Sequence, residues 1–150
     1  MTLPANRELL VRMLDALGSK DFDGFEACLD KDLRCEWPYA VMEGFPTELV
    51  GARRLREALQ ASFAKFTPYN YRIIEMYDLV DPNRLIAEYS SHCTYLPRGV
   101  PYSNRYLGIF DFRAATITRW REYVNPLIVR EALGTDLVWR ESHGVVKNTR

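Results

Sequence analysis

The sequence predicts an α+β fold in which helices pack on one face of a curved antiparallel sheet. Apolar residues recur at helical spacing in the first part of the chain, up to about residue 66. From about residue 70 to residue 124, apolar and polar residues alternate with the two-residue period of strands. Helices followed by consecutive strands are typical of this fold class, and 150 residues suffice for one domain with a substantial core.

Three helices are expected before the long strands. An amphipathic helix should span about Ala5 to Leu17 and end at Gly18. Asp21 is the expected N-cap of a second, shorter helix. A third helix is expected from about Ala52 to Phe66, where apolar residues form one stripe.

One short strand and four longer strands are expected. Leu33 to Trp37 alternates like a strand, and the Gly- and Pro-rich stretch from Pro38 to Gly51 should be a loop that could act as a mobile lid. The longer strands are Asn70–Tyr77, Arg84–Tyr95, Ser103–Arg113 and Ala115–Val124.

The last strand should pass directly into a short helix. Asn125 is a suitable N-cap and Pro126 suits the first helical turn, so a helix is expected from about Leu127 to Leu133, ended by Gly134. Residues 1–134 are therefore assigned to one domain.

The remaining residues, 135–150, should form a partly ordered C-terminal tail. Leu137, Val138 and Trp139 are candidates to dock on the domain, and the last few residues are expected to be disordered.

Composition narrows the function classes. Acidic and basic residues balance at 20 each, so neither nucleic acid nor an anionic membrane is an expected partner. No apolar run approaches the length of a membrane span and no signal peptide is recognisable. Three cysteines cannot all pair within one chain and none forms a Cys-x-x-Cys motif, which favours a reduced, cytoplasmic protein. The 13% aromatic content, with nine tyrosines, suits a pocket for a flat or ring-shaped ligand.

Metal and nucleotide chemistry have little support in the sequence. The chain has two histidines, His92 and His143, and no Gly-rich phosphate loop. We therefore expect neither a metal site nor a cofactor.

The order of elements and three local sequences resemble the SnoaL-like branch of the NTF2-like superfamily, which includes ketosteroid isomerases and phenazine-biosynthesis A/B proteins. The local sequences are Leu17-Gly18-Ser19-Lys20-Asp21-Phe22-Asp23-Gly24, Asn104-Arg105-Tyr106 and Trp120–Gly134. The resemblance covers about Ala5 to Gly134. It implies a cone-shaped, cystatin-like fold in which a bent antiparallel sheet and helices enclose a deep apolar pocket. It also implies a homodimer, which we expect to form through the sheet face.

The resemblance carries over only part of the known catalytic groups. The two donors and the base of ketosteroid isomerases correspond by the flanking motifs to Met13, Gly108 and Trp37. All three groups are absent, so the resemblance does not imply steroid isomerisation by that mechanism, unless Glu36 shifts register to act as the base.

Two other branches carry a catalytic carboxylate on a late strand with which Glu122 can be compared, and it matches residue for residue only in the phenazine-biosynthesis proteins. Phenazine-biosynthesis proteins use a Glu on the last strand, which Glu122 matches through Arg121-Glu122-Tyr123-Val124-Asn125, and a His on the third helix, whose place falls at Ala58. SnoaL-type polyketide cyclases carry an acid–base Asp and a His on late strands, a pair that Glu122 and His92 could imitate.

Glu122 is the first candidate catalytic residue, because the apolar residues Trp120 and Val124 flank it on the same strand face. Burial would raise the pKa of its carboxyl group toward neutrality, where the group can both accept and donate a proton. The alternative is a carboxylate that pairs with Arg105 or Arg119 and only stabilises the sheet.

His92 and Glu88 share one face of their strand with Ser90 and Thr94. The resemblance indicates that this is the inner face, which makes His92 a candidate catalytic residue and Glu88 a candidate substrate-binding residue. Alternatively, this face is solvated and the Tyr89 face packs against a partner.

Asn104, Tyr106, Gly108 and Phe110 share a face of the next strand. Tyr106 could donate a hydrogen bond to a substrate carbonyl, Gly108 would leave space for a ligand, and Asn104 and Phe110 would contact it. The alternative is an ordinary aromatic core face that tolerates one glycine.

Glu36, Trp37 and Tyr39 are expected at the mouth of the cone, and Trp120 beside Glu122. All four are candidate substrate-binding residues, with Glu36 also a candidate second carboxylate. Such residues could instead cap the core.

These residues favour a cofactor-free enzyme of the isomerase, cyclase or hydratase kind, acting on a hydrophobic small molecule that contains a carbonyl group. Glu122 would move a proton between carbon and oxygen, and Tyr106 or His92 would stabilise the enolate. A non-catalytic ligand carrier or a dimeric interaction module of the same fold remains the alternative.

Overall fold

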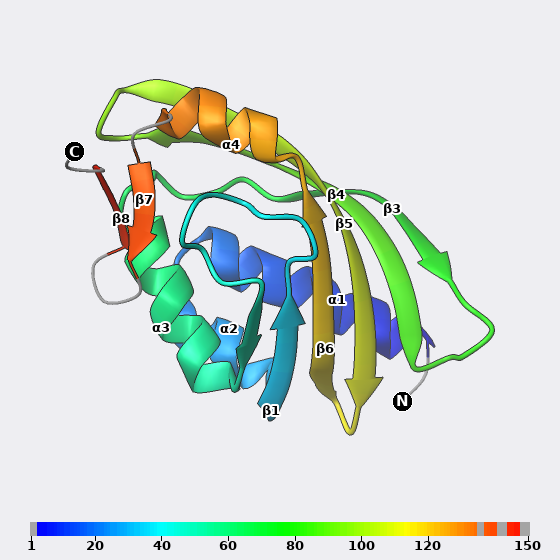
Figure 1. Cartoon of the computed structure of the whole chain (residues 1–150). Helices are drawn as coiled ribbons and strands as arrows, with labels where there is room; N and C mark the ends of the chain where they lie inside the picture. Colours follow the sequence, from blue (N-terminus) through cyan, green and yellow to red (C-terminus); the bar gives the residue numbers. More distant parts are fainter. Residues whose placement is uncertain (1–2, 135–136, 141–143, 148–150) are drawn as a thin grey trace.

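A computed structural model describes residues 3–134, 137–140 and 144–147, and its side chains are described from residue 4 to residue 134. Figure 1 shows the arrangement of the elements. In chain order the elements are α1 (Leu3–Gly18), α2 (Phe22–Ala27), β1 (Leu29–Glu36), β2 (Glu48–Val50), α3 (Ala52–Phe63), β3 (Arg72–Asp78), β4 (Arg84–Tyr95), β5 (Val100–Arg113), β6 (Thr116–Val124), α4 (Pro126–Leu133), β7 (Leu137–Arg140) and β8 (Gly144–Lys147).

The six strands from β1 to β6 form one curved sheet in the order β2-β1-β6-β5-β4-β3. Helices α1, α2 and α3 lie on its concave side, and α4 lies across the end of β5 (Figure 1). The predicted α+β class is therefore confirmed. The prediction of a wholly antiparallel sheet is wrong at one pair, because β1 and β6 run parallel. Parallel neighbours need a long connection, and here most of the domain separates them in the chain.

The core fills the space between α1 and the sheet. Buried residues of α1 recur at the predicted helical spacing and meet the inward residues of β4, β5 and β6. The side chains from α1 that are almost fully enclosed are Leu9, Leu10, Met13, Leu14 and Leu17. The stripe that predicted the helix is thus the stripe that holds it to the sheet.

The predicted caps of α2 and α4 are present, and α1 ends at Gly18, although this glycine is needed for another reason than expected. Asp21 caps α2 by accepting a hydrogen bond from the Gly24 amide (3.0 Å), and Asn125 caps α4 in the same way. Gly18 is helical, and a Cβ added there would lie 2.5 Å from the carbonyl oxygen of Tyr69. A glycine is required at this position by close packing, because any side chain would collide with that backbone.

Several boundaries differ from the predictions. β1 begins at Leu29 and not at Leu33, and α3 ends at Phe63. The predicted loop 38–51 contains β2, which pairs with β1 through Leu49. A short strand of this kind depends on its partner more than on its own sequence.

The C-terminal tail contributes a two-stranded sheet of β7 and β8, and β8 lies near α3. The side chains of Leu137, Val138 and Trp139, and the last residues expected to be disordered (148–150), lie outside the described residues. Within the described part of the chain, no helix is both long and apolar enough to cross a membrane.

Candidate functional site

A cavity lies between the concave face of the sheet, α3, α4 and the loop that joins β1 to β2. The volume of the cavity is about 80 Å³, enough for several water molecules or one small molecule. Most of its wall is aromatic or aliphatic, and its polar atoms belong to a few side chains. The polar residues are Glu122, Ser62, Tyr69, Tyr71, Tyr102 and Tyr106; the apolar or indole wall includes Leu17, Trp37, Val41, Met42, Phe45, Leu59, Phe63, Phe66, Trp120, Val124, Val129 and Leu133.

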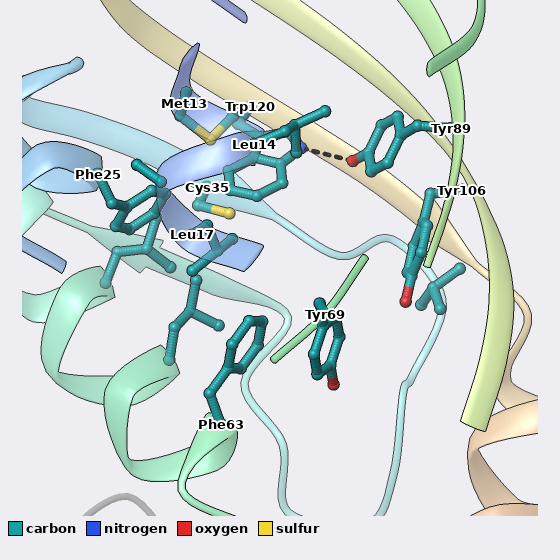
Figure 2. Close-up of a cluster of buried hydrophobic side chains, with 14 of the residues drawn as sticks. Met13, Leu14, Leu17, Phe25, Cys35, Phe63, Tyr69, Tyr89, Tyr106 and Trp120 are labelled. Atoms are coloured by element: carbon teal, nitrogen blue, oxygen red, sulfur yellow. Dashed lines mark hydrogen bonds between the residues drawn. The ribbon is translucent and has the colours of Figure 1, made fainter. Parts of the chain in front are cut away.

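Glu122 lies on the inner face of β6, and its side chain reaches the cavity. The residue is 9% exposed. The Tyr89 hydroxyl donates a hydrogen bond to Oε2, and Trp37 Nε1 donates to Oε1 at 3.3 Å. Trp120 Nε1 in turn donates to the Tyr89 hydroxyl at 3.2 Å, as Figure 2 shows. The carboxyl group is therefore held in one orientation by two donors.

Burial raises the pKa of Glu122 from 4.5 to about 7, although the hydrogen bonds from Tyr89 and Trp37 lower it. The effect of desolvation on this pKa exceeds that of the two hydrogen bonds, because neither donor carries a full positive charge. At neutral pH the protonated and ionised forms are then both populated, which is the condition for a group that takes up and releases a proton.

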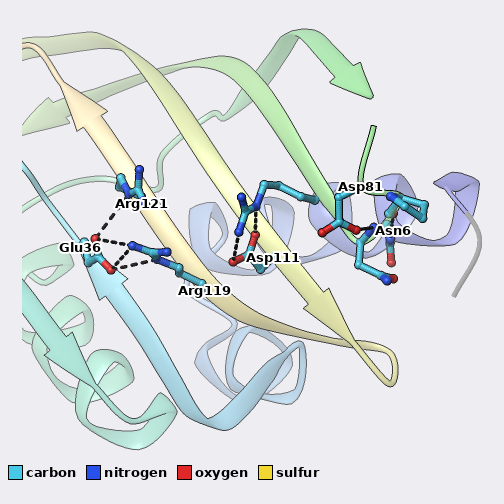
Figure 3. A network of polar contacts seen from close by, with 9 residues as sticks. Asn6, Glu36, Asp81, Asp111, Arg119 and Arg121 are labelled. Carbon is cyan, nitrogen blue, oxygen red and sulfur yellow. Dashed lines mark hydrogen bonds and ion pairs between the residues drawn. The ribbon is translucent and has the colours of Figure 1, made fainter. Parts of the chain in front are cut away.

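The alternative pairing of Glu122 with Arg119 does not occur. Figure 3 shows Arg119 on the other face of the sheet, where it binds Glu36 through two hydrogen bonds of 3.0 and 3.2 Å. Arg121 also reaches Glu36, at 3.4 Å. The expectation that Glu36 lies at the cavity mouth is wrong, because the alternation of β1 turns Cys35 inward and Glu36 outward.

The expectation that His92 and Glu88 face the cavity is wrong as well. The inner face of β4 is the other one, formed by Leu85, Ala87, Tyr89, Ser91, Cys93 and Tyr95. This face buries more apolar surface than its polar counterpart could, so the hydrophobic effect selects it. His92 is exposed, and its Nδ1 contacts Ser103 Oγ at 2.5 Å.

Tyr106 lines the cavity as predicted, but its hydroxyl is engaged within the protein. It lies 2.7 Å from Ser91 Oγ and 3.3 Å from the Tyr102 hydroxyl. Asn104 is buried and donates to the Tyr102 hydroxyl (3.0 Å) and to the Asn125 carbonyl (3.1 Å). Asn104 therefore fixes the junction of β5 and α4 and is not part of the cavity wall.

Gly108 leaves no room for a ligand, contrary to expectation. A Cβ added there would lie 2.4 Å from Phe110 Cε2 and 3.1 Å from Tyr89 Cε1. The Phe110 ring occupies this space and stacks on Trp120, with 5.7 Å between ring centroids. Trp120 lines the cavity, whereas Phe110 packs against Trp120 and is not part of the cavity wall.

Trp37 and Tyr39 take opposite positions although both follow β1. Trp37 is buried in the cavity wall, as predicted, and its ring meets Phe45 edge-on at 4.9 Å. Tyr39 is 62% exposed and packs edge-on against Tyr123 on the outer side of the sheet. The expectation that Tyr39 lies at the mouth of the cavity is therefore wrong.

Three tyrosines of the site were not anticipated from the sequence: Tyr69, Tyr71 and Tyr89. Tyr69 and Tyr71 line the cavity, and Tyr89 holds Glu122. The signal for Tyr89 was its position among apolar residues of β4. Tyr69 and Tyr71 precede β3, and only the density of aromatic residues from Phe66 onward marked them.

Burial keeps these phenols protonated. It raises the pKa of Tyr69, Tyr71, Tyr89 and Tyr106 well above 10 and that of Tyr102 to about 12. Near neutral pH the tyrosines of the site are therefore hydrogen-bond donors.

No cluster of three or more His, Cys, Asp or Glu side chains suited to a metal ion occurs among the residues described.

Comparison with known proteins identifies relatives along most of the chain. The profile of the SnoaL-like domain matches residues 10–120. The uncharacterized protein YesE from Bacillus subtilis (strain 168) is 27% identical over 137 residues, which are 91% of this chain and 92% of YesE. The phenazine biosynthesis protein PhzB from Pseudomonas fluorescens is 26% identical over 105 residues, which are 68% of this chain and 65% of PhzB.

Solved structures agree with this assignment. A crystal structure from Bacillus subtilis, of a protein provisionally assigned as an isomerase, has a TM-score of 0.83 and 26% identity, with 90% of this chain and 97% of that chain covered. Proteins with the NTF2-like fold also match, which confirms the expected fold. By its matching profile and its fold, the chain belongs to the SnoaL-like domain family.

Proposed function

We propose that the protein is a cofactor-free enzyme of the isomerase, cyclase or hydratase kind that uses Glu122 as its general acid and base. The observation that carries the proposal is the Glu122 carboxyl group, which is buried at a cavity, held by two neutral donors and has a pKa of about 7. Its substrate would be a hydrophobic small molecule with a carbonyl group.

The surroundings of Glu122 suit proton transfer at carbon. Trp37 and Trp120 shield the carboxyl group from bulk water, so its charge is not dispersed by solvent. The phenol hydroxyls in the same cavity could stabilise negative charge that develops on a substrate oxygen. Both requirements of enolate chemistry are then met in one enclosed space.

Two relatives lend support of a general kind. PhzB acts in phenazine biosynthesis, and the Bacillus subtilis structure that matches this chain has been provisionally assigned as an isomerase. We extend to this chain only the general class of small-molecule enzyme, and no substrate.

The three buried cysteines, none of them paired in a disulfide, favour a reducing compartment such as the cytoplasm.

The test is the Glu122→Gln variant. Native protein and variant are incubated in D₂O with a panel of neutral cyclic enones, ketones and lactones, and exchange of carbon-bound hydrogen for deuterium is followed by NMR. Removal of a general base typically costs about 10²–10⁴-fold in rate, so exchange by the variant should fall by at least about 100-fold.

The matched control is Glu88→Gln, which changes a carboxylate on the outer face of β4 and should leave exchange unchanged. Full exchange activity in Glu122→Gln, with the fold intact, would rule out the proposed role of Glu122.

A ligand carrier is the second candidate function, and one observation favours it. Both Glu122 oxygens already accept hydrogen bonds from Tyr89 and Trp37, so the carboxyl group could serve only to fix the cavity wall. Saturable binding of a panel compound without any exchange would support a carrier.

A further inference from the structure

Two tyrosine hydroxyls in the cavity have no hydrogen-bond partner among the described residues. In the part of the chain that the structure describes, no hydrogen bond joins the hydroxyl of Tyr69 or Tyr71 to another protein atom, whereas those of Tyr89, Tyr102 and Tyr106 each contact a side chain. Neither hydroxyl oxygen is fully enclosed by protein atoms, and both residues line the cavity, so a molecule there can reach them. The hydroxyls of Tyr69 and Tyr71 are therefore the groups left for a ligand.

The segment that carries both tyrosines is held firmly. The Asn70 amide donates to the His92 carbonyl at 3.1 Å, which ties the backbone between the two tyrosines to β4. On the other side, a Cβ added at Gly18 would lie 2.5 Å from the Tyr69 carbonyl oxygen and 3.0 Å from Tyr71 Cδ2. The end of α1 and β4 thus fix this segment between them.

Ring contacts link Tyr69 through Tyr71 to Tyr89, the tyrosine that binds Glu122. The Tyr71 ring centroid lies 5.5 Å from that of Tyr69 and 6.0 Å from that of Tyr89, whose hydroxyl binds Glu122. In Figure 2 the hydroxyls of Tyr69 and Tyr106 point the same way, into the space between the sheet and the Phe63 side of the wall. A molecule in the cavity would meet phenol donors and the carboxyl group together.

The charges of the wall select the ligand further. Among the described residues that line the cavity there is no Lys, Arg or His, and Glu122 is the acidic residue. A ligand carboxylate would be desolvated without a counter-charge and close to a second carboxyl group, which is costly. An uncharged ligand with an acceptor oxygen fits the wall.

We propose that Tyr69 and Tyr71, and not Tyr106, bind the carbonyl oxygen of an uncharged cyclic enone or ketone. This inference rests on the proposed function. The Glu122 carboxylate removes a proton from the carbon next to the carbonyl group, and the electron pair of that C–H bond becomes the C=C bond of an enolate. The carbonyl oxygen takes the negative charge and accepts hydrogen bonds from the two hydroxyls. Protonated Glu122 then returns the proton to the same or another carbon.

The experiment compares two probes with the same ring size, cyclohex-2-enone and cyclohexanecarboxylate. Dissociation constants are measured by NMR titration for the native protein, Tyr69→Phe, Tyr71→Phe and Tyr106→Phe. Tyr77→Phe is the matched control, because Tyr77 is exposed and its hydroxyl donates to Glu75. Each variant keeps its aromatic ring, and thermal unfolding checks that it folds.

The expected result is specific to two positions. Enone binding should weaken at least about tenfold in Tyr69→Phe and in Tyr71→Phe, equivalent to about 1.4 kcal/mol each, and less than about twofold in Tyr106→Phe and Tyr77→Phe. The carboxylate should bind the native protein at least about tenfold more weakly than the enone. Unchanged enone affinity in both variants, the largest loss in Tyr106→Phe, tighter binding of the carboxylate, or no saturable enone binding would each overturn the inference.

Binding and catalysis can fail separately. The same titration in the Glu122→Gln background needs no proton transfer, so binding that depends on Tyr69 and Tyr71 without deuterium exchange in the native protein would sustain this inference and defeat the proposed enzyme. Deuterium exchange that is as fast in Tyr69→Phe and Tyr71→Phe as in the native protein would sustain the proposed enzyme and overturn this inference.

Discussion

The Glu122 side chain carries a free-energy cost that depends on pH. The pKa of its carboxyl group is 4.5 in an exposed reference state and about 7 when buried in the folded protein. At roughly 1.4 kcal/mol per pKa unit, this difference corresponds to about 3 kcal/mol. A cost of this size is a sizeable part of the stability of a small domain. Strongly shifted pKa values of this kind are common at functional sites.

The pH dependence of stability follows from this shift. Between pH 4.5 and pH 7 the unfolded chain loses the Glu122 proton while the folded chain keeps it, so the native protein should lose stability as pH rises through this window. The unfolding free energy of the native protein minus that of Glu122→Gln should therefore fall by about 3 kcal/mol between pH 4.5 and pH 8. Urea unfolding of both proteins across this range measures it, and a difference that stays constant with pH would contradict it.

At the residue scale, the sequence located Glu122 and Trp37 but not most of their neighbours. The alternation of β6 sufficed for Glu122, because Trp120 and Val124 flank it on the same face. On β4 both faces alternate regularly, and the face of Leu85, Ala87 and Tyr89 is the more apolar one, which the packed fold buries. His92 and Glu88 were assigned inward from the resemblance, and Tyr89 was missed.

At the scale of single elements, β5 is shaped by one glycine. Gly108 allows the Phe110 ring to fold back against its own strand and to stack on Trp120. Phe110 is fully buried, so its ring cannot easily move aside. The position of the Trp120 indole, and through it the Tyr89 hydroxyl, therefore depends on the absence of a side chain at residue 108.

Gly108→Ala should destabilise the protein. The added methyl group would lie 2.4 Å from a Phe110 ring carbon, and overpacking of this kind typically costs about 1–3 kcal/mol. Urea unfolding at fixed pH measures the loss. Gly99→Asn is a suitable control, because a Cβ at Gly99 has open space and Asn tolerates its φ of 61°. Equal stability of Gly108→Ala and the native protein would show that the core adapts at no cost.

Elements with a strong local pattern were predictable from the sequence, and those fixed by distant partners were not. The bounds of β4 were predicted without error, and the caps Asp21 and Asn125 hold α2 and α4 as expected. β2 has three residues and exists through its pairing with β1. The parallel contact of β1 with β6 joins opposite ends of the domain, which no local pattern records.

At the scale of the whole molecule, we propose that the outer face of the sheet binds a second copy of the chain. Ile86, Leu107 and Ile109 form a half-buried apolar strip there. Ion pairs flank this strip. Arg84 pairs with Asp111 on one side, and Arg119 and Arg121 pair with Glu36 on the other. A face with balanced charges around an apolar centre can complement itself in a two-fold dimer.

We expect the protein to be a dimer through this face, and Leu107→Asp to weaken it. Light scattering behind a sizing column should give about twice the 17.5 kDa chain mass for the native protein, with the variant shifted toward one chain mass. Val11→Asp places the same charge at an exposed apolar position on α1 and should leave the mass unchanged. A native protein that runs as a monomer, or equal masses for the native protein and Leu107→Asp, would refute this interface.

Trp37 joins two parts of the molecule that could otherwise behave independently. Its indole N–H favours the ionised form of Glu122, while its ring contacts Phe45 in the loop over the cavity. A movement of the loop that withdraws the indole would make Glu122 more basic. By thermodynamic reciprocity, a proton on Glu122 would release the loop by the same free energy. The position of the loop and the proton affinity of Glu122 would then be coupled through one equilibrium.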